Sequence, residues 1–261
     1  LSKLGVFDYD GSSQINSKTF TTDATFKSDI GIATTSLSID NYKDVAQASY
    51  KGNIILSSFD IGALTKEPSL GEVSANVSID GRGFTQKTVD TGLSGVISSF
   101  SFQGYDYKNI TLQGALKDPV FNGDLSIDDP NVQLDFKGLV DVSKSFNQFD
   151  FQADVHFAEL NKLQLVSRDS VSVFAGKVVV DMDGTTIDDI VGSFSFQQTF
   201  YQNQDDDFYF DDFKIASSFE DQKRIIDINS PDICNGTISG NFLIKDISNL
   251  FRNGLGSMYA N

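Results

Sequence analysis

The sequence predicts an all-β fold in which antiparallel strands form an elongated open groove. Composition is the first reason: Phe, Ser, Thr, Asp, Asn and Gly are plentiful, and the residues that build long amphipathic helices are sparse. The second reason is a strict alternation of apolar and polar residues along the chain. The third is an internal repeat of about a hundred residues.

Alternation with a period of two marks strands that have one apolar and one polar face. The clearest strand is 149–157, in which apolar side chains take every second position and His156 lies among the polar ones. We count about fourteen such strands. The other well-marked strands are 20–26, 50–56, 73–79, 96–102, 110–116, 125–127, 132–136, 178–182, 194–200, 213–219 and 238–244. Strands with one wet face are typical of antiparallel sheets joined by hairpins.

Pairs of turn-forming residues are predicted to separate many of these strands. They are Asp80-Gly81, Asn122-Gly123, Asp129-Pro130, Asp183-Gly184 and Asn235-Gly236. Four short segments, 60–64, 158–163, 188–191 and 247–252, are predicted as single helical turns, placed at bends or over the apolar face.

The repeat relates the stretch 58–81 to the stretch 157–184, and both end in Asp-Gly. Similar Phe-rich strands follow, S-S-F-S-F-Q at 98–103 and G-S-F-S-F-Q at 192–197, and a third copy begins at 246. We therefore expect residues 1–261 to be one continuous segment of about two and a half repeats, with any membrane anchor outside it. Units cut at both ends stack on their neighbours, which favours a long groove over a closed sandwich.

Reactive side chains are too few to suggest an enzyme. The chain has one histidine, His156, and one cysteine, Cys234, so neither a catalytic triad nor a zinc site has enough residues. The acidic run 205–207 is interpreted as a solvated hairpin tip rather than a calcium site. No metal or cofactor is expected. The net charge of −16 argues against nucleic acid as a partner, because phosphates require basic side chains.

Several stretches resemble the AsmA/TamB family of Gram-negative envelope proteins, and TamB-like chains of Bacteroidota in particular. They are F-D-I-G-A-L at 59–64 with V-S-A-N-V-S-I-D-G-R-G-F at 73–84, Y-D-Y-K-N-I-T-L at 105–112, S-I-D-D-P-N-V-Q-L-D-F-K-G at 126–138 and N-S-P-D-I-C-N-G-T-I-S-G-N-F at 229–242. The resemblance implies a β-taco and a periplasmic bridge that carries phospholipid between the inner and outer membranes. It also implies an inner-membrane anchor and a BamA-like outer-membrane barrel as partner, both acting through regions outside this segment.

The residues expected to face phospholipid acyl chains are those of the alternating apolar set, for which packing in an ordinary core is the competing interpretation. They are Phe100, Phe102, Ile110, Leu112, Leu125, Ile127, Leu134, Phe136, Phe149, Phe151, Val155, Phe157, Val178, Val180, Phe194 and Phe196. Two other functions stay open. The chain could bind nascent outer-membrane β-barrel proteins through its sheet edges, or it could be an extracellular β-sandwich adhesin.

Overall fold

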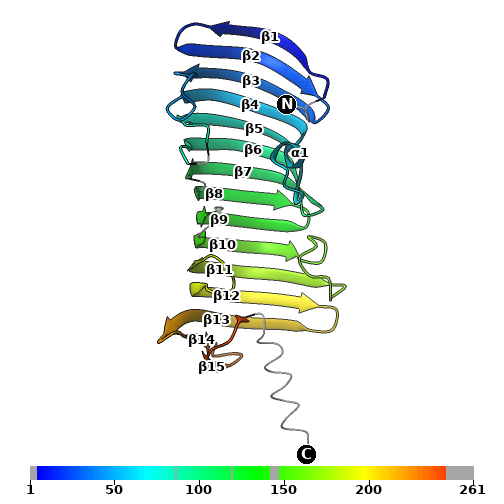
Figure 1. Cartoon of the computed structure of the whole chain (residues 1–261). Helices are drawn as coiled ribbons and strands as arrows, with labels where there is room; N and C mark the ends of the chain where they lie inside the picture. The colour runs from blue at the N-terminus through cyan, green and yellow to red at the C-terminus, as the bar shows by residue number, and fades with distance from the viewer. Residues whose placement is uncertain (1–4, 86, 119, 142–146, 245–261) are drawn as a thin grey trace, which may run out of the picture.

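A computed structural model describes residues 5–85, 87–118, 120–141 and 147–244 of the chain. They form one antiparallel sheet of fifteen strands, each hydrogen-bonded to the strands before and after it in the sequence (Figure 1). The sheet is open, because β1 and β15 do not pair with each other. The predicted all-β groove of repeated hairpins is thus confirmed. The strands are β1 (Asp8–Ile15), β2 (Thr19–Ser28), β3 (Gly31–Asp40), β4 (Ser49–Asp60), β5 (Leu70–Arg82), β6 (Asp90–Phe102), β7 (Tyr105–Lys117), β8 (Val120–Asp129), β9 (Val132–Asp141), β10 (Asn147–Glu159), β11 (Ser172–Gly184), β12 (Val191–Asn203), β13 (Asp207–Glu220), β14 (Lys223–Asn229) and β15 (Asn235–Gly240).

Four of the five predicted turn pairs lie in strands instead: Asp80-Gly81 in β5, Asn122-Gly123 in β8, Asp183-Gly184 at the end of β11 and Asn235-Gly236 at the start of β15. The glycine in β8 has a packing role instead. Gly123 pairs with Gly114 across the sheet, and the Phe121 ring lies over both. A Cβ atom on Gly123 would stand 3.0 Å from Cζ of that ring. The two glycines therefore leave space above the sheet, and the aromatic ring of Phe121 fills it.

Backbone irregularities follow one another across the sheet near one end of the strands. Residues Ser58, Asn109 and Gln198 have left-handed φ angles of 44°, 51° and 48° in β4, β7 and β12. The pairing of β10 with β11 shifts register between Val155 and Ala158. An extra residue in a strand bends it and reverses which face the following side chains occupy. Side chains therefore alternate regularly between the two faces over most of each strand, and the alternation is interrupted near this end.

Short covering segments lie at the same end of the strands. The helix α1 (Ile61–Thr65) follows β4 and packs beside β5 (Figure 1). Asp60 caps its N-terminus by accepting a hydrogen bond from the backbone N–H of Ala63 at 2.8 Å. After β10, turns at 160–164 place Leu163 against Val132, leaving it only 4% exposed.

The other two predicted helical turns have different outcomes. Residues 187–189 form a turn between β11 and β12, and this turn is not a helix. The segment 247–252 lies outside the described residues, as does the predicted start of the third repeat.

The repeat corresponds to six strands. α1 follows β4 and the 160–164 turns follow β10, so β4–β9 and β10–β15 have matching covering segments. The two Phe-rich hexapeptides, however, do not occupy equivalent places. Phe100 pairs with Val73 beyond the irregularity in β6, whereas Phe194 pairs with Val180 in the middle of β12. The residue that takes the place of Phe100 in the second unit is Tyr201, opposite Phe174.

Candidate functional site

The alternating apolar side chains lie in rows that cross the sheet at right angles to the strands; we call the surface they form the apolar face. Strand register fixes each row, because directly paired residues point to the same side. The longest row at mid-sheet runs from β7 to β13 as Leu112, Leu125, Phe136, Ala153, Val178, Phe196 and Phe213. The row beside it runs through Ile110, Ile127, Leu134 and Val155.

The register places every expected acyl-facing residue except Phe157 on this one face. Phe149 and Phe151 extend the rows along β10, and Phe151 continues through Val180 to Phe194. Phe100 and Phe102 pair with Tyr107 and Tyr105 near the end of the strands that carries α1. The rows continue toward the N-terminus through β3, β4, β5 and β6. Their members there, which the expected set did not include, are Leu37, Ile54, Leu56, Val77, Ile79, Leu93 and Ile97.

Phe157 is on the other face, and this is a correction to the expected set. Val155 pairs with Leu134 on the apolar face. After the register shift, Phe157 pairs with Gln133, which is next to Leu134 in β9 and therefore points to the polar face. On the next strands, Ala175 of β11 pairs with Phe200 of β12, and Phe200 pairs with Tyr209 of β13. The rings of Phe200 and Tyr209 are 4.9 Å apart. The irregularities therefore move a few aromatic residues onto the polar face.

The apolar face is half-buried along most of its length, and no second sheet faces it among the residues that the structure describes. Of the expected set, only Ile110 is strongly buried, at 4% exposure. Among the described residues, a compact hydrophobic cluster around Val132, Ala158 and Leu163 lies where the 160–164 turns fold over the strand ends. Monomeric soluble proteins rarely leave an apolar surface of this length open, and such a surface marks a binding site.

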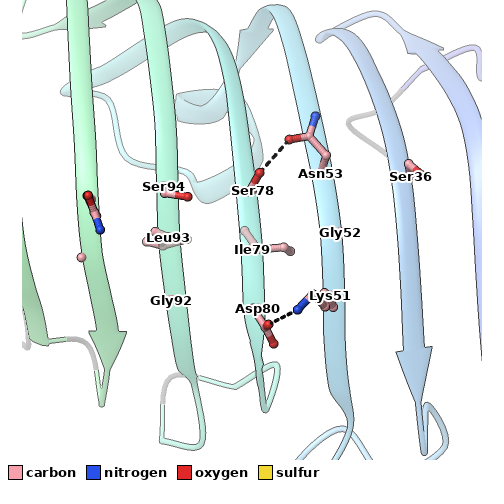
Figure 2. A pocket seen from close by; sticks show the side chains of 12 residues that line it. Ser36, Lys51, Gly52, Asn53, Ser78, Ile79, Asp80, Gly92, Leu93 and Ser94 are labelled. Carbon is pink, nitrogen blue, oxygen red and sulfur yellow. Dashed lines mark hydrogen bonds and ion pairs between the residues drawn. The ribbon is translucent and has the colours of Figure 1, made fainter.

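The polar face carries isolated charged pairs at its surface. Figure 2 shows a shallow hollow of about 650 Å³ on it, with the Lys51 ammonium 2.7 Å from the Asp80 carboxylate. His156 lies 3.0 Å from Asp135 Oδ2, and both side chains are mostly exposed. The hydrogen bond from His156, with one from Ser126, lowers the pKa of the Asp135 carboxyl. Exposed pairs of this kind contribute little to stability.

Two tyrosine–aspartate pairs close the strand ends near the covering segments. Tyr105 donates to Asp129, which is only 1% exposed and also accepts from the backbone N–H of Lys108 at 2.9 Å and of Asn131 at 2.8 Å. Burial and the bond to Asp129 raise the pKa of Tyr105 to about 12. The Tyr201 hydroxyl is 3.0 Å from Asp169 Oδ2 in the second unit. Both aspartates are buried, so the pairs are structural.

Sequence reasoning missed the concentration of aromatic rings at the C-terminal end of the apolar face. It is formed by Phe174, Tyr201, Phe208, Phe210 and Phe213, which join the predicted Phe196. The signal was present, because β13 contains D-F-Y-F-D-D-F, but the phase change in β12 hides which of these rings share a face.

Within the described ranges, no group of three or more His, Cys, Asp or Glu side chains is placed to hold a metal ion. No helix found there has the length and apolar character needed to cross a membrane. Comparison of the chain with protein-family models, with curated proteins and with solved structures gives no match.

Proposed function

We propose that the apolar face binds the acyl chains of phospholipids and forms part of a path for lipid between the inner and outer membranes of a Gram-negative bacterium. The protein would then act in the periplasm, with a BamA-like barrel as partner and a membrane anchor, both through regions outside this segment. The observation that carries the proposal is the unbroken set of apolar rows from β3 to β13, open to one side.

The free energy of exposing lipid chains to water explains what such a face would accomplish. A two-chain lipid has about 30 methylenes, and at ~0.8 kcal/mol each their transfer into water costs on the order of 20–25 kcal/mol. The eleven strands β3–β13, spaced ~4.8 Å apart, give apolar rows about 48 Å long. A lipid moving along them would keep its chains in contact with protein while its head group stays in water, so no catalytic residue is needed.

Substitution within one strand tests this proposal. Leu112 and Thr111 are consecutive in β7 and lie on opposite faces, the first half-buried in a central row and the second exposed. Leu112→Asp places a charge among the acyl chains, so we expect bound phospholipid, measured by native mass spectrometry and solvent extraction, to fall several-fold. Thr111→Asp should leave it unchanged. Equal lipid content in the two variants, or a wild-type protein that purifies without lipid, would overturn the proposal.

A second function, binding of nascent β-barrel proteins, is favoured by the sheet edges. All eight residues of β1 are exposed, and β1 pairs only with β2. An open edge can accept a strand from another protein. Photo-crosslinkers at Asp10 in β1 and at Leu112 on the apolar face separate the two functions, since the first would label client proteins and the second acyl chains. The adhesin alternative requires two sheets packed face to face, whereas the described residues form a single sheet.

A further inference from the structure

A pocket of about 570 Å³ lies at the C-terminal end of the apolar face, and we call it the aromatic pocket. Six aromatic residues line it: Phe174, Phe196, Tyr201, Phe208, Tyr209 and Phe210. Its size falls within the range of small-molecule sites, which are mostly apolar with a few placed polar groups. Phe196 belongs both to this pocket and to the longest apolar row, so the pocket opens from the apolar face.

The pocket exists because β14 is half as long as its neighbour. β14 has seven residues and pairs with 214–220 of β13, so 207–213 have no neighbouring strand on that side among the described residues. The loop between β14 and β15 reaches this free edge, where Asp232 accepts a hydrogen bond from the Asp211 backbone N–H at 2.8 Å. The same loop adds Ile233 to the lining.

An unpartnered hydroxyl lies in the wall of the pocket. Thr199 is 3% exposed, and its Oγ1 has no hydrogen-bond partner in the structure. It lies above Gly176, where a Cβ atom would be 2.9 Å from that oxygen. Because Gly176 has no side chain, the neighbouring strand offers no side-chain hydrogen-bond partner to Thr199 Oγ1 at this point. A buried hydroxyl without a hydrogen bond is unfavourable, and a ligand in the pocket is the group positioned to supply one.

The charges around the pocket determine what that ligand can be. Asp207 and Asp232 are part of the lining, which contains no Lys or Arg. Asp207 pairs with Gln202 and alternates with Phe208, so its side chain lies toward the polar face. The carboxylate available to a ligand is that of Asp232, of which Oδ2 accepts the bond from the Asp211 backbone N–H. Carboxylates repel an anionic head group, whereas they attract a cation, and the faces of aromatic rings attract a cation as well.

We infer that the aromatic pocket binds the ammonium group of an amphiphile with a primary amine head, whose chain lies along the apolar face. A primary ammonium carries three N–H donors, which suits both the acceptor capacity of Thr199 Oγ1 and the Asp232 carboxylate. The inference rests on the proposed function, because it assigns a head-group class to the ligand of the same face.

The test compares three soluble ligands of equal chain length, decylamine, decanol and decanoate, titrated into the protein below their aggregation concentrations and followed by NMR. We expect decylamine to bind at least tenfold more tightly than decanol, and decanoate to bind most weakly. Asp232→Asn, which keeps an acceptor for the Asp211 N–H, and the isosteric Thr199→Val should each weaken decylamine several-fold and leave decanol unchanged. Asp181→Asn removes the same charge from an exposed position on the polar face and should change neither affinity.

The outcomes separate this inference from the proposed function. If the three ligands bind equally and Leu112→Asp weakens them all, the apolar face binds chains but the head-group inference is wrong. Decylamine binding that is insensitive to Asp232→Asn also overturns the inference. If none of the three binds, the apolar face does not take acyl chains and both proposals fail.

Discussion

Arg224 in β14 is the largest side chain that the structure buries completely, at 1% exposure. Its guanidinium donates to Ser217 Oγ at 2.7 Å and to the backbone carbonyls of Asp188 and Ile190, and it lies 4.5 Å from the Phe219 ring centre. These bonds join β13 and β14 to the connection that follows β11. One buried cation thus fixes a loop whose own sequence offers few apolar contacts.

We expect Arg224→Met to lower the free energy of unfolding by about 3 kcal/mol, because it removes hydrogen bonds from a charged donor. The Asp188 carbonyl loses its bond from Arg224, whereas the Ile190 carbonyl keeps the bond from Ser217 Oγ. Urea denaturation measures this. Arg82→Met is the matched control: Arg82 is exposed and makes a surface ion pair with Asp90 at 3.1 Å, so its loss should cost less than ~1 kcal/mol. Similar midpoints for the two variants would show that the Arg224 bonds do not hold the loop.

The Tyr105–Asp129 pair gives a pH dependence at the residue scale. The folded-state pKa of Tyr105 is raised from 10.0 to about 12, so the folded protein holds this proton more tightly than the unfolded chain does. The stabilisation is fully present below pH 10 and is lost as the pH rises from 10 through 12.

Tyr105→Phe should therefore lower stability by about 1–2 kcal/mol at pH 7, since Asp129 loses a donor, and should flatten the fall in stability above pH 10. Denaturation between pH 7 and 11 is the measurement. Tyr107→Phe is the control: the Tyr107 hydroxyl has no hydrogen bond within the described structure, although burial raises its pKa. An unchanged alkaline slope in Tyr105→Phe would contradict the assignment.

At the scale of the strand, alternation in the sequence predicts the faces well and the irregularities poorly. Phe149 and Phe151 lie where a period of two puts them, but Phe157 and Phe200 follow an extra residue and lie on the polar face. Glycine and asparagine tolerate left-handed backbone, yet two of the three residues that adopt it within β4, β7 and β12 are Ser58 and Gln198. The intrinsic backbone preferences of Ser58 and Gln198 do not predict the left-handed conformation, because the register with neighbouring strands imposes it.

Gln198 tests this imposed strain. It is exposed, with φ of 48°, and its side chain makes no hydrogen bond in the described structure. Gln198→Gly should raise the free energy of unfolding by up to ~1 kcal/mol, and Gln198→Val should lower it by about 1–2 kcal/mol, because a β-branched residue resists positive φ. Thermal unfolding monitored by circular dichroism gives both values. If valine is tolerated as well as glycine, the backbone there does not hold the left-handed conformation.

At the scale of the whole molecule, the sequence predicted a long open sheet from its repeat and from the absence of helices to cover the strands. It could not predict the order of the rows, because that depends on register, nor the short β14 that opens the aromatic pocket. It also misplaced turns at Asp80-Gly81 and Asn122-Gly123, since pairwise turn signals cannot distinguish a hairpin from a glycine that makes room for Phe121.

A sheet in which every strand pairs only with its chain neighbours should respond locally to damage, as repeat proteins do. Gly138 in β9 allows a test, because its φ is 143° and a Cβ atom there would lie 2.3 Å from the Asp150 carbonyl oxygen in β10. We expect Gly138→Ala to raise amide hydrogen exchange at least tenfold, about 1.4 kcal/mol, in β8–β10, while β2 and β3 exchange as in the wild type. Gly92→Ala in β6 is the control, since its Cβ would be 3.6 Å from the nearest atom, Asp80 O, an ordinary contact. Exchange that rises uniformly through all strands of Gly138→Ala would mean that the sheet unfolds as one cooperative unit, and the nearest-neighbour description would have to be abandoned.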